Sequence, residues 1–202
     1  LINGSQNVLL NEQDIVEVRD GYTLLGVSSA ATNEIISEFT WKDSDGVEHL
    51  LRSNSTILQV YVGTVEGTAF NAWYTLEDGF TSESKMYFDS WWSSTEAEDI
   101  LLFVDGETDN LHEWSGGRAL FSADATATIT KAGSNTWAQQ RFLTAGTRQV
   151  RILDSGGTWR TFTYTGGETT TTLTGVSPDP TAFTFSANAL ILQEVRPNDN
   201  TP

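Results

Sequence analysis

The alternation of hydrophobic and polar residues predicts a β-hairpin in the first part of the chain. Residues 34–42 (EIISEFTWK) are rich in the β-branched and aromatic side chains that favour strands. The polar stretch 43–46 follows and ends in Asp45-Gly46, a dipeptide typical of tight turns between antiparallel strands. Residues 47–52 (VEHLLR) then form a second hydrophobic run. The pattern therefore predicts strand, turn and strand over this stretch.

Short hydrophobic runs separated by turn residues continue as far as residue 114. The expected strands are 56–62, 69–76, 85–92, 99–105 and 110–114. Repetition at this spacing is typical of all-β sandwiches, barrels and propellers. The order of elements in the first hairpin region partly recurs further along the chain, without a clean sequence repeat. Propeller-like blades and an ordinary β-meander therefore both remain open.

From about residue 118 the chain becomes rich in threonine and much less acidic. Further strands are expected at 148–154, 158–165, 169–176 and 187–195. Residues 136–146 (TWAQQRFLTAG) are expected to form one short helix that Thr136 caps and Gly146 ends. The fold class that we predict is all-β. An acidic β-meander or partial β-propeller unit is followed by a small threonine-rich β-barrel or sandwich domain with one short helix.

The distribution of charge supports a division into two units. Residues 1–113 hold 21 acidic and 4 basic residues, a net charge of −17, whereas residues 114–202 hold 6 acidic and 7 basic residues, a net charge of +1. We therefore predict an acidic β-unit at 1–117, a small β-domain at 118–196 and a tail at 197–202. The near-neutral second unit repels neighbours less, so it is the expected surface for packing against other subunits.

Composition excludes several classes of protein. The net charge of −16 argues against nucleic-acid binding, which needs clustered lysine and arginine. No apolar run approaches the roughly 20 residues that cross a bilayer, and the chain has no cysteine for disulfides or thiolate metal sites. A hydrophobic content of 38% is too high for a disordered acidic tail. Because the sequence starts at Leu1, we expect a processed chain or a piece of a longer protein.

The sequence shows no motif of a known catalytic type. It contains neither a G-x-S-x-G nucleophile elbow nor a phosphate-binding P-loop. The two histidines, His49 and His112, lie far apart in expected strands, so a catalytic or metal-binding pair needs the fold to join them. Two half-buried strand histidines are the simpler interpretation. Many carboxylates could form a glycosidase pair, but nothing selects one. We predict no enzymatic activity and no cofactor.

Two clusters of acidic residues could supply oxygen ligands for Ca²⁺. They are Asp43, Asp45 and Glu48 in the first hairpin, and Asp105, Glu107 and Asp109 after the strand 99–105. Neither cluster matches an EF-hand, because no glutamate stands at the twelfth position. Solvated carboxylates in hairpin turns are the simpler interpretation, and the second cluster is kept as a weak metal candidate.

Aromatic side chains are the expected contact residues. Most strand aromatics fill the core of a β-protein, but Trp91 and Trp92 are adjacent, and adjacent strand residues face opposite sides of a sheet. At least one of them should therefore meet a partner or a ligand, and a second subunit is the favoured occupant. Trp159 and Tyr164, in the threonine-rich unit, are the other predicted partner or ligand contacts.

Three segments resemble the β-rich structural proteins of tailed bacteriophages: 18–26 (VRDGYTLLG), 99–117 and 142–180. The most specific motif runs from Tyr164 through Gly166-Gly167-Glu168 and Leu173-Thr174-Gly175-Val176 to Pro178-Asp179-Pro180. The resemblance implies propeller-like β-repeats with a small inserted β-domain, and it brings no catalytic residues. Proteins of this group are longer, so a propeller built from this chain alone would be incomplete.

The predicted function is that of a non-enzymatic structural component of a phage virion, associated with the tail or neck. It would act through β-surface contacts with other virion proteins or with copies of itself, as an oligomer located in the phage particle. Neither nucleic acid nor membrane insertion is expected. The alternative is a carbohydrate- or receptor-binding β-module, with or without a calcium requirement.

Overall fold

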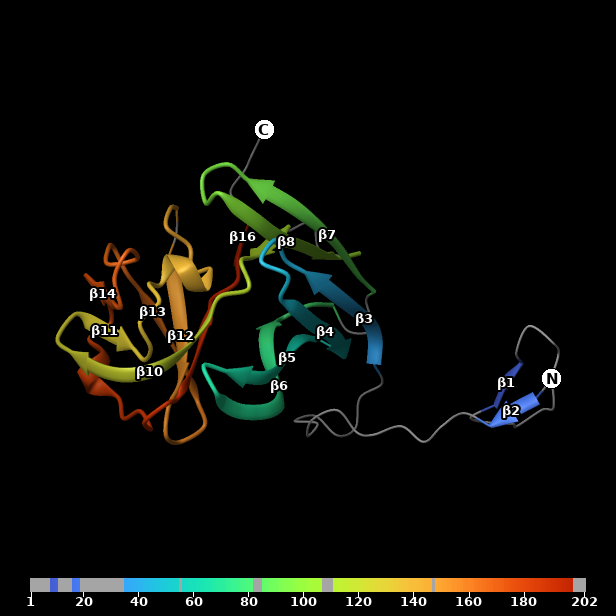
Figure 1. Cartoon of the computed structure of the whole chain (residues 1–202), viewed down its shortest axis with the longest axis horizontal. Coiled ribbons are helices and arrows are strands. Elements are labelled where there is room, and N and C mark those ends of the chain that lie inside the picture. The colour runs from blue at the N-terminus through green and yellow to red at the C-terminus, as the bar shows by residue number, and fades with distance from the viewer. Residues whose placement is uncertain are drawn as a thin grey trace.

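The computed structural model describes residues 8–10, 16–18, 35–54, 56–81, 85–106, 111–146 and 148–197 of the chain (Figure 1). The regular secondary structure of these residues consists of β-strands and two single turns of 3-10 helix, which confirms the all-β prediction. The first strands are β1 (Val8–Leu10), β2 (Val16–Val18), β3 (Ile35–Lys42), β4 (Glu48–Asn54), β5 (Ile57–Val65), β6 (Thr68–Asp78), β7 (Met86–Ser93), β8 (Glu98–Asp105) and β9 (His112–Trp114). The later elements are β10 (Arg118–Ala125), β11 (Thr128–Lys131), η1 (Ala138–Gln140), β12 (Gln149–Leu153), β13 (Trp159–Thr163), β14 (Thr172–Thr174), η2 (Pro180–Ala182), β15 (Leu190–Gln193) and β16 (Arg196–Pro197).

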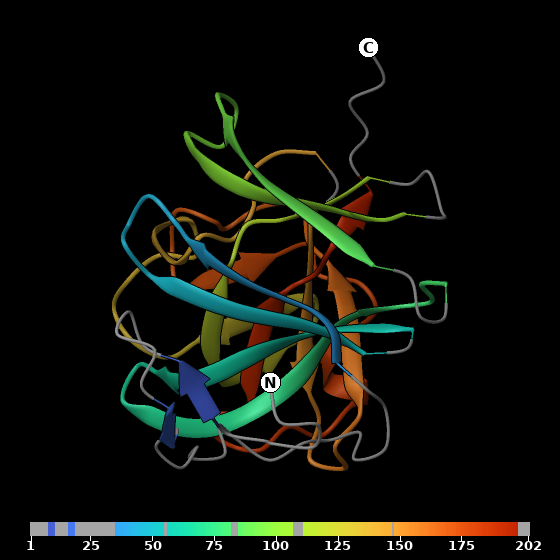
Figure 2. The ribbon, with the colours of Figure 1, turned by 90° about the vertical axis from the view of Figure 1, so that its right-hand side faces the viewer.

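Three antiparallel sheets form the body of the molecule, beside the two-stranded β1–β2 pair. The first sheet has the order β3-β4-β5-β6 and the second the order β16-β9-β8-β7. The third sheet has the order β13-β12-β15-β10-β11-β14. Figures 1 and 2 show the second sheet above the first, with the third sheet packed alongside both. A propeller arrangement of the first two sheets stays a prediction.

The predicted first hairpin is confirmed. Strands β3 and β4 pair antiparallel, with Trp41 opposite His49. In the turn, Gly46 N donates to Asp43 O at 2.9 Å, and Gly46 adopts a φ of +83°, which a glycine reaches without steric cost. The Asp43 carboxylate accepts a hydrogen bond from Val47 N at 2.8 Å, so its side chain also holds the turn closed.

The third sheet is open but its edges meet. Within the part of the chain that the structure describes, no ladder joins β13 to β14, although isolated bridges pair Thr163 with Ser177 and Gly166 with Thr174. The sheet therefore curls towards a barrel without closing. The chain passes from the second sheet to the third near the predicted end of the acidic unit, since β9 belongs to the second sheet and β10 to the third. The chain then returns, because β16 pairs with β9.

The predicted helix at 136–146 is wrong. Only one 3-10 turn forms, at Ala138–Gln140, and Arg141 then adopts a left-handed conformation with a φ of 64°. The Thr136 hydroxyl accepts a hydrogen bond from Gln139 N at 3.1 Å, but the N-cap position of the turn is occupied by Trp137 and not by Thr136. The helix stops because Trp137 and Phe142 both enter the core, where their rings meet edge to face at 4.7 Å. Tertiary packing here overrides the local helical pattern.

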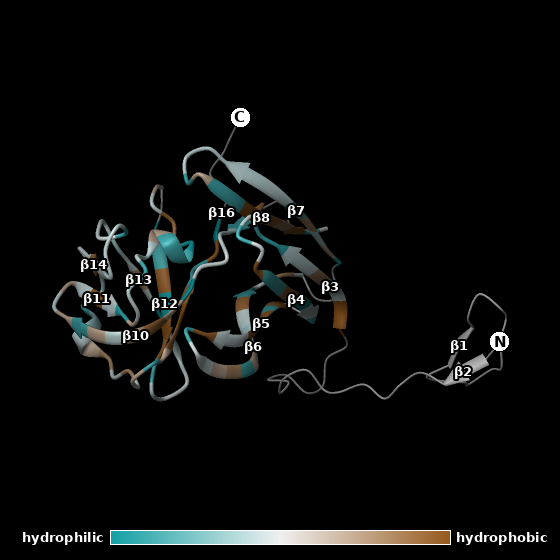
Figure 3. Cartoon of the chain, in the orientation of Figure 1, coloured by the Kyte–Doolittle hydropathy of each residue, from teal (hydrophilic) through white to brown (hydrophobic). Residues whose placement is uncertain are grey.

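The third sheet is hydrophobic on both faces. On β10 and β15, Ala119 and Ile191 belong to a core inside the threonine-rich unit, whereas Leu120, Leu190 and Leu192 belong to a core shared with the first two sheets. Figure 3 shows hydrophobic residues concentrated along β12 and its neighbours. Full burial of one such side chain contributes about 1.5–3 kcal/mol. The two units predicted from composition therefore share one of the two hydrophobic cores, and the other lies within the threonine-rich unit.

We expect Leu192→Ala to destabilise both units together. Leu192 is fully buried in the shared core, and removing a buried leucine side chain costs about 2–5 kcal/mol. Urea unfolding followed by tryptophan fluorescence and by far-ultraviolet circular dichroism should give one coincident transition, shifted to lower urea. Thr174→Ala, at an exposed β14 position, is the control. Two separate transitions in the wild type would contradict the shared core.

Candidate functional site

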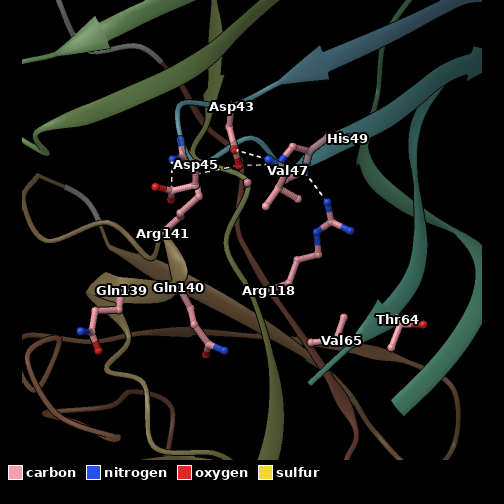
Figure 4. A pocket seen from close by; sticks show the side chains of 11 residues that line it. Asp43, Asp45, Val47, His49, Thr64, Val65, Arg118, Gln139, Gln140 and Arg141 are labelled. Carbon is pink, nitrogen blue, oxygen red and sulfur yellow. Dashed lines mark hydrogen bonds and ion pairs between the residues drawn. The ribbon is translucent and has the colours of Figure 1, made fainter. Parts of the chain in front are cut away.

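A polar pocket of about 410 Å³ lies where the two units meet (Figure 4). Its walls come from the β3–β4 turn, strands β4 and β5, the β9–β10 linker, the start of β10 and the 3-10 turn η1. Segments far apart in the sequence thus build one site. Figure 4 shows their side chains arranged around the hollow, with Arg118 and Arg141 reaching it from the threonine-rich unit.

His49 is the centre of a buried hydrogen-bonded chain beside this pocket. Its Nε2 lies 2.9 Å from Asp43 Oδ2, and its Nδ1 contacts the guanidinium of Arg118. An arginine can only donate, so Nδ1 accepts and Nε2 carries the proton that it donates to Asp43. Burial lowers the pKa of His49 to about 4, with Arg118 reinforcing the shift and Asp43 opposing it. The imidazole is therefore neutral at pH 7.

Asp43 stays ionised despite its burial. Burial raises the pKa of this carboxyl, but the hydrogen bonds from His49 and Val47 together with the charge of Arg141 outweigh that effect and lower the pKa. The Arg141 Nε atom lies 3.4 Å from Asp43 Oδ2. Two members of the expected Asp43–Asp45–Glu48 cluster thus have partners within the protein: Asp43 contacts His49 and Arg141, and Asp45 contacts Arg141.

Arg141 gathers carboxylates from two different hairpins. Its Nη1 lies 3.4 Å from both Asp45 Oδ2 and Glu98 Oε2, and its Nη2 lies 3.0 Å from Asp99 Oδ1. Its Nε also donates to the backbone oxygen of Ser115 at 2.8 Å. Arg141 is buried, so these bonds supply the partners that a buried guanidinium requires. The arginine connects the first sheet, the second sheet and the threonine-rich unit.

The β9–β10 linker passes so close to this cluster that glycine is required. A Cβ at Gly116 would lie 2.8 Å from His49 Cε1, and one at Gly117 would lie 2.9 Å from the Arg141 backbone oxygen. The ring of His49 stacks on Trp41 at 4.8 Å and meets the edge of Trp114 at 5.2 Å. Aromatic packing thus fixes the imidazole in the orientation that both hydrogen bonds need.

Chemically, the cluster has the contacts of a structural network. Both His49 nitrogens are engaged and the residue is 1% exposed, so it has no free nitrogen to accept a substrate proton. The nearby Ser115 hydroxyl donates to the Arg141 backbone oxygen. His112 lies on β9 against Phe103 and Phe80, and is not joined to His49.

Of the three predicted metal candidates, the structure describes Asp105 alone. Asp105 is buried, and its carboxylate accepts a hydrogen bond from Thr81 N at 3.0 Å, which fixes the chain after β6. Glu107 and Asp109 lie outside the described residues. Within the described part of the chain, no three histidine or acidic side chains are placed to hold a metal ion. Over those same residues no helix has the length and apolarity needed to cross a membrane.

The residues predicted to be aromatic contacts differ in how far they are exposed. Trp91 and Trp92 are 59% and 58% exposed on β7, and Tyr87 of the same strand is 55% exposed. Tyr164 is instead a core residue, 3% exposed, whose hydroxyl donates to Leu143 O at 2.7 Å. It is buried because the β13 register turns Phe162 and Tyr164 towards the inner core. Trp159 is half-buried and packs edge to face on Tyr74 of β6 at 5.9 Å.

Sequence reasoning missed the basic residues that join the two units. Of the seven basic residues after residue 113, five contact the acidic part of the chain: Arg118, Lys131, Arg141, Arg151 and Arg196. Arg151 donates to Leu76 O at 2.6 Å, and Lys131 lies 3.6 Å from Glu66. The available signal was the charge split itself, since a near-neutral unit beside a strongly acidic one can place its few cations at their junction.

Comparisons of the chain with protein-family models, with curated proteins and with solved structures give no match.

We expect Gly116→Ala to destabilise the protein more than Gly157→Ala. Both glycines have positive φ values, of +87° and +80°, but an added Cβ meets His49 only at position 116 and meets nothing within 4 Å at position 157. The backbone effect costs about 1–2 kcal/mol at either site, and the clash adds about 1–3 kcal/mol. Thermal unfolding of the two variants measures the difference. Equal losses would show that the linker tolerates a side chain.

Glu98 makes the stability of the junction depend on pH. Burial raises its pKa from 4.5 to about 7, with Glu96, Asp45 and Asp99 adding to the shift and Arg141 opposing it. Between these two values the folded protein retains a proton that the unfolded chain releases, so the group's contribution to stability falls as pH rises. Glu98→Gln removes that loss. The free energy of unfolding of the variant, relative to that of the wild type, should therefore be about 1–3 kcal/mol higher at pH 8 than at pH 4.

Chemical denaturation of both proteins at the two pH values tests this expectation. Other titrating groups, including His49, act in both proteins and cancel in the difference. A stability difference that does not change with pH would contradict the assignment.

Proposed function

We propose that this chain is a non-enzymatic structural subunit of a phage virion, associated with the tail or neck, that assembles through β-surface contacts. The observation that carries the proposal is the exposed aromatic edge of the second sheet. Among the described strands, β7 pairs with β8 alone, and it carries Tyr87, Trp91 and Trp92 at the surface. Exposed aromatic clusters on a rigid strand are typical of protein contact surfaces.

The two halves of β7 differ in how far they are covered. Near its start, Met86 N donates to Ser37 Oγ at 3.1 Å and Phe88 stacks on Phe39 of β3 at 4.8 Å. Further along, Asp89 accepts a hydrogen bond from Ser90 N at 2.8 Å. A charged side chain that occupies an edge N–H restricts unwanted strand pairing. The two tryptophans follow directly, so contact there would rest on side chains more than on a new ladder.

The distribution of charge favours the aromatic edge over the threonine-rich unit as the surface that meets a neighbouring subunit. Five of the seven basic residues of the threonine-rich unit already contact the acidic part of the same chain. The expectation that this unit offers the favoured packing surface therefore loses part of its basis. A neighbour that meets β7 must instead accept apolar rings beside acidic residues such as Asp89.

The resemblance of residues 142–180 to tailed-phage structural proteins supplies the biological setting of the proposal, including location in the virion and neighbours of the same kind. The alternative, a carbohydrate- or receptor-binding module that uses exposed tryptophan, would need those rings beside a hollow. The pocket of Figure 4 has no tryptophan among its wall residues.

We expect the wild-type protein to form a symmetric oligomer, and the double variant Trp91→Ser/Trp92→Ser to dissociate at least about tenfold more readily, since each lost aromatic contact removes 1 kcal/mol or more. Sedimentation velocity and mass photometry over a range of concentrations measure the change. Val47→Ser is the control, because Val47 is a similarly exposed apolar residue elsewhere, at 47%. A wild-type protein that stays monomeric throughout would overturn the proposal.

A further inference from the structure

Arg118 differs from the other basic residues around it. Among the described basic residues after 113, each of the other six has a carboxylate within ion-pairing distance; those six are Lys131, Arg141, Arg148, Arg151, Arg160 and Arg196. Arg118 has a histidine nitrogen instead. The charge of Asp43 acts on Arg118, but this carboxylate is bonded to His49 and Val47 and forms no ion pair with Arg118. The Arg118 guanidinium is therefore available to a further anion.

The guanidinium of Arg118 is held in place and remains charged. Its one hydrogen bond in the described part of the chain goes to His49 Nδ1, and His49 is itself fixed by Asp43 and the stacked ring of Trp41. Burial lowers the pKa of Arg118 to about 10, which still leaves it protonated at pH 7. A guanidinium carries five N–H donors in a planar fork that matches a carboxylate. Four donors therefore remain for another partner.

The rest of the pocket wall combines neutral polar groups with an apolar surface of comparable extent. Gln139, Gln140 and Thr64 supply amides and a hydroxyl, while Val47 and Val65 supply the apolar part. Gln140 Nε2 donates to Glu66 at 2.7 Å, which leaves its Oε1 as a buried acceptor with no partner among the described residues. That oxygen is closed to solvent in this structure, so a ligand hydroxyl would meet it only after rotation of the Gln140 side chain.

The charges of the wall limit how negative a ligand can be. Asp43 and Asp45 also line the pocket, and both are engaged by Arg141. With a net charge of −16 on the chain, each additional negative charge on a ligand is repelled by the field of the whole protein. A single carboxylate on a neutral hydroxylated body fits the wall better than a phosphate with two charges. The volume of about 410 Å³ is within the range of small-molecule sites.

We propose that this pocket binds a hydroxylated monocarboxylic acid of the uronic-acid type, with its carboxylate on Arg118 and its hydroxyls towards Gln139, Gln140 and Thr64. This site is separate from the Trp91–Trp92 edge and goes beyond the structural role proposed above. It would hold a sugar acid through Arg118 and polar side chains, and so differs from a carbohydrate-binding module that stacks its ligand on exposed tryptophan. The two proposals can therefore fail independently.

The test is a titration of the full chain with glucuronate, followed by isothermal calorimetry and by the indole N–H signals of the tryptophans. Trp41 stacks on His49, so its signal reports on occupancy. We expect saturable binding with a Kd of about 0.1–10 mM, the range for a small polar ligand with few contacts. Glucose lacks the carboxylate and acetate lacks the hydroxyls. Each should bind at least about tenfold more weakly, as should inorganic phosphate.

Single substitutions distinguish binding at this pocket from non-specific binding of anions to the other arginines of the protein. Arg118→Gln should weaken glucuronate binding at least tenfold, and Arg118→Lys should weaken it less, since the charge remains but the fork is lost. Gln140→Ala tests the hydroxyl contacts, and carries the test if Arg118→Gln does not fold. Arg160→Gln, at an arginine on β13 that pairs with Asp154, is the matched control and should bind as wild type does.

Absence of saturable glucuronate binding to the folded wild-type protein would overturn the proposal. Unchanged binding by folded Arg118→Gln, or by Gln140→Ala if Arg118→Gln does not fold, would do the same. Equal binding of glucose would remove the role of the carboxylate, and equal binding of acetate or phosphate would remove the uronic-acid assignment.

Discussion

The arrangement of this protein depends on one buried guanidinium. Arg141 leaves η1 in a left-handed conformation and reaches carboxylates on the β3–β4 turn and on β8, which belong to different sheets. Desolvating these charges costs several kcal/mol per ion, and their mutual contacts offset that cost only when every partner is in place. Such a cluster adds little net stability, but all of its contacts form together in this relative position of the three sheets.

The same constraint explains why the short helix fails to form. A regular helix through residues 136–146 would project the side chains of Trp137, Arg141 and Phe142 in directions set by helical periodicity. The structure needs Trp137 and Phe142 in the inner core and Arg141 in the carboxylate cluster. A single 3-10 turn followed by a left-handed residue satisfies all three demands. The glycines at 116 and 117 have a related role, because they admit the linker beside this cluster.

Burial of charge and burial of apolar surface cooperate at the junction. The third sheet places Leu120, Leu190 and Leu192 against the first two sheets, and Arg151 crosses the same junction to reach backbone oxygens of β6. The cations of the threonine-rich unit are thus largely committed within the chain. The outer surface keeps its negative charge, and the contact surface that remains distinctive is the aromatic edge of β7. The pocket beside Arg118 arises at this junction as well, where two curved sheets meet.

The all-β class and most strands of the body could be predicted from the sequence, because period-two alternation and Asp-Gly turns are local properties, as the Asp43–Gly46 hairpin shows. The sequence also indicated the charge division and placed at least one of Trp91 and Trp92 outside the core, and both are exposed. Which residues meet across that division depends on how the three sheets pack. Arg141 and Asp99 are 42 residues apart, and Arg118 and His49 are 69 apart. No local pattern encodes such pairs. The burial of Tyr164 was decided in the same way, because the alternation of β13 defines two faces but the packing of the sheets selects the inner one.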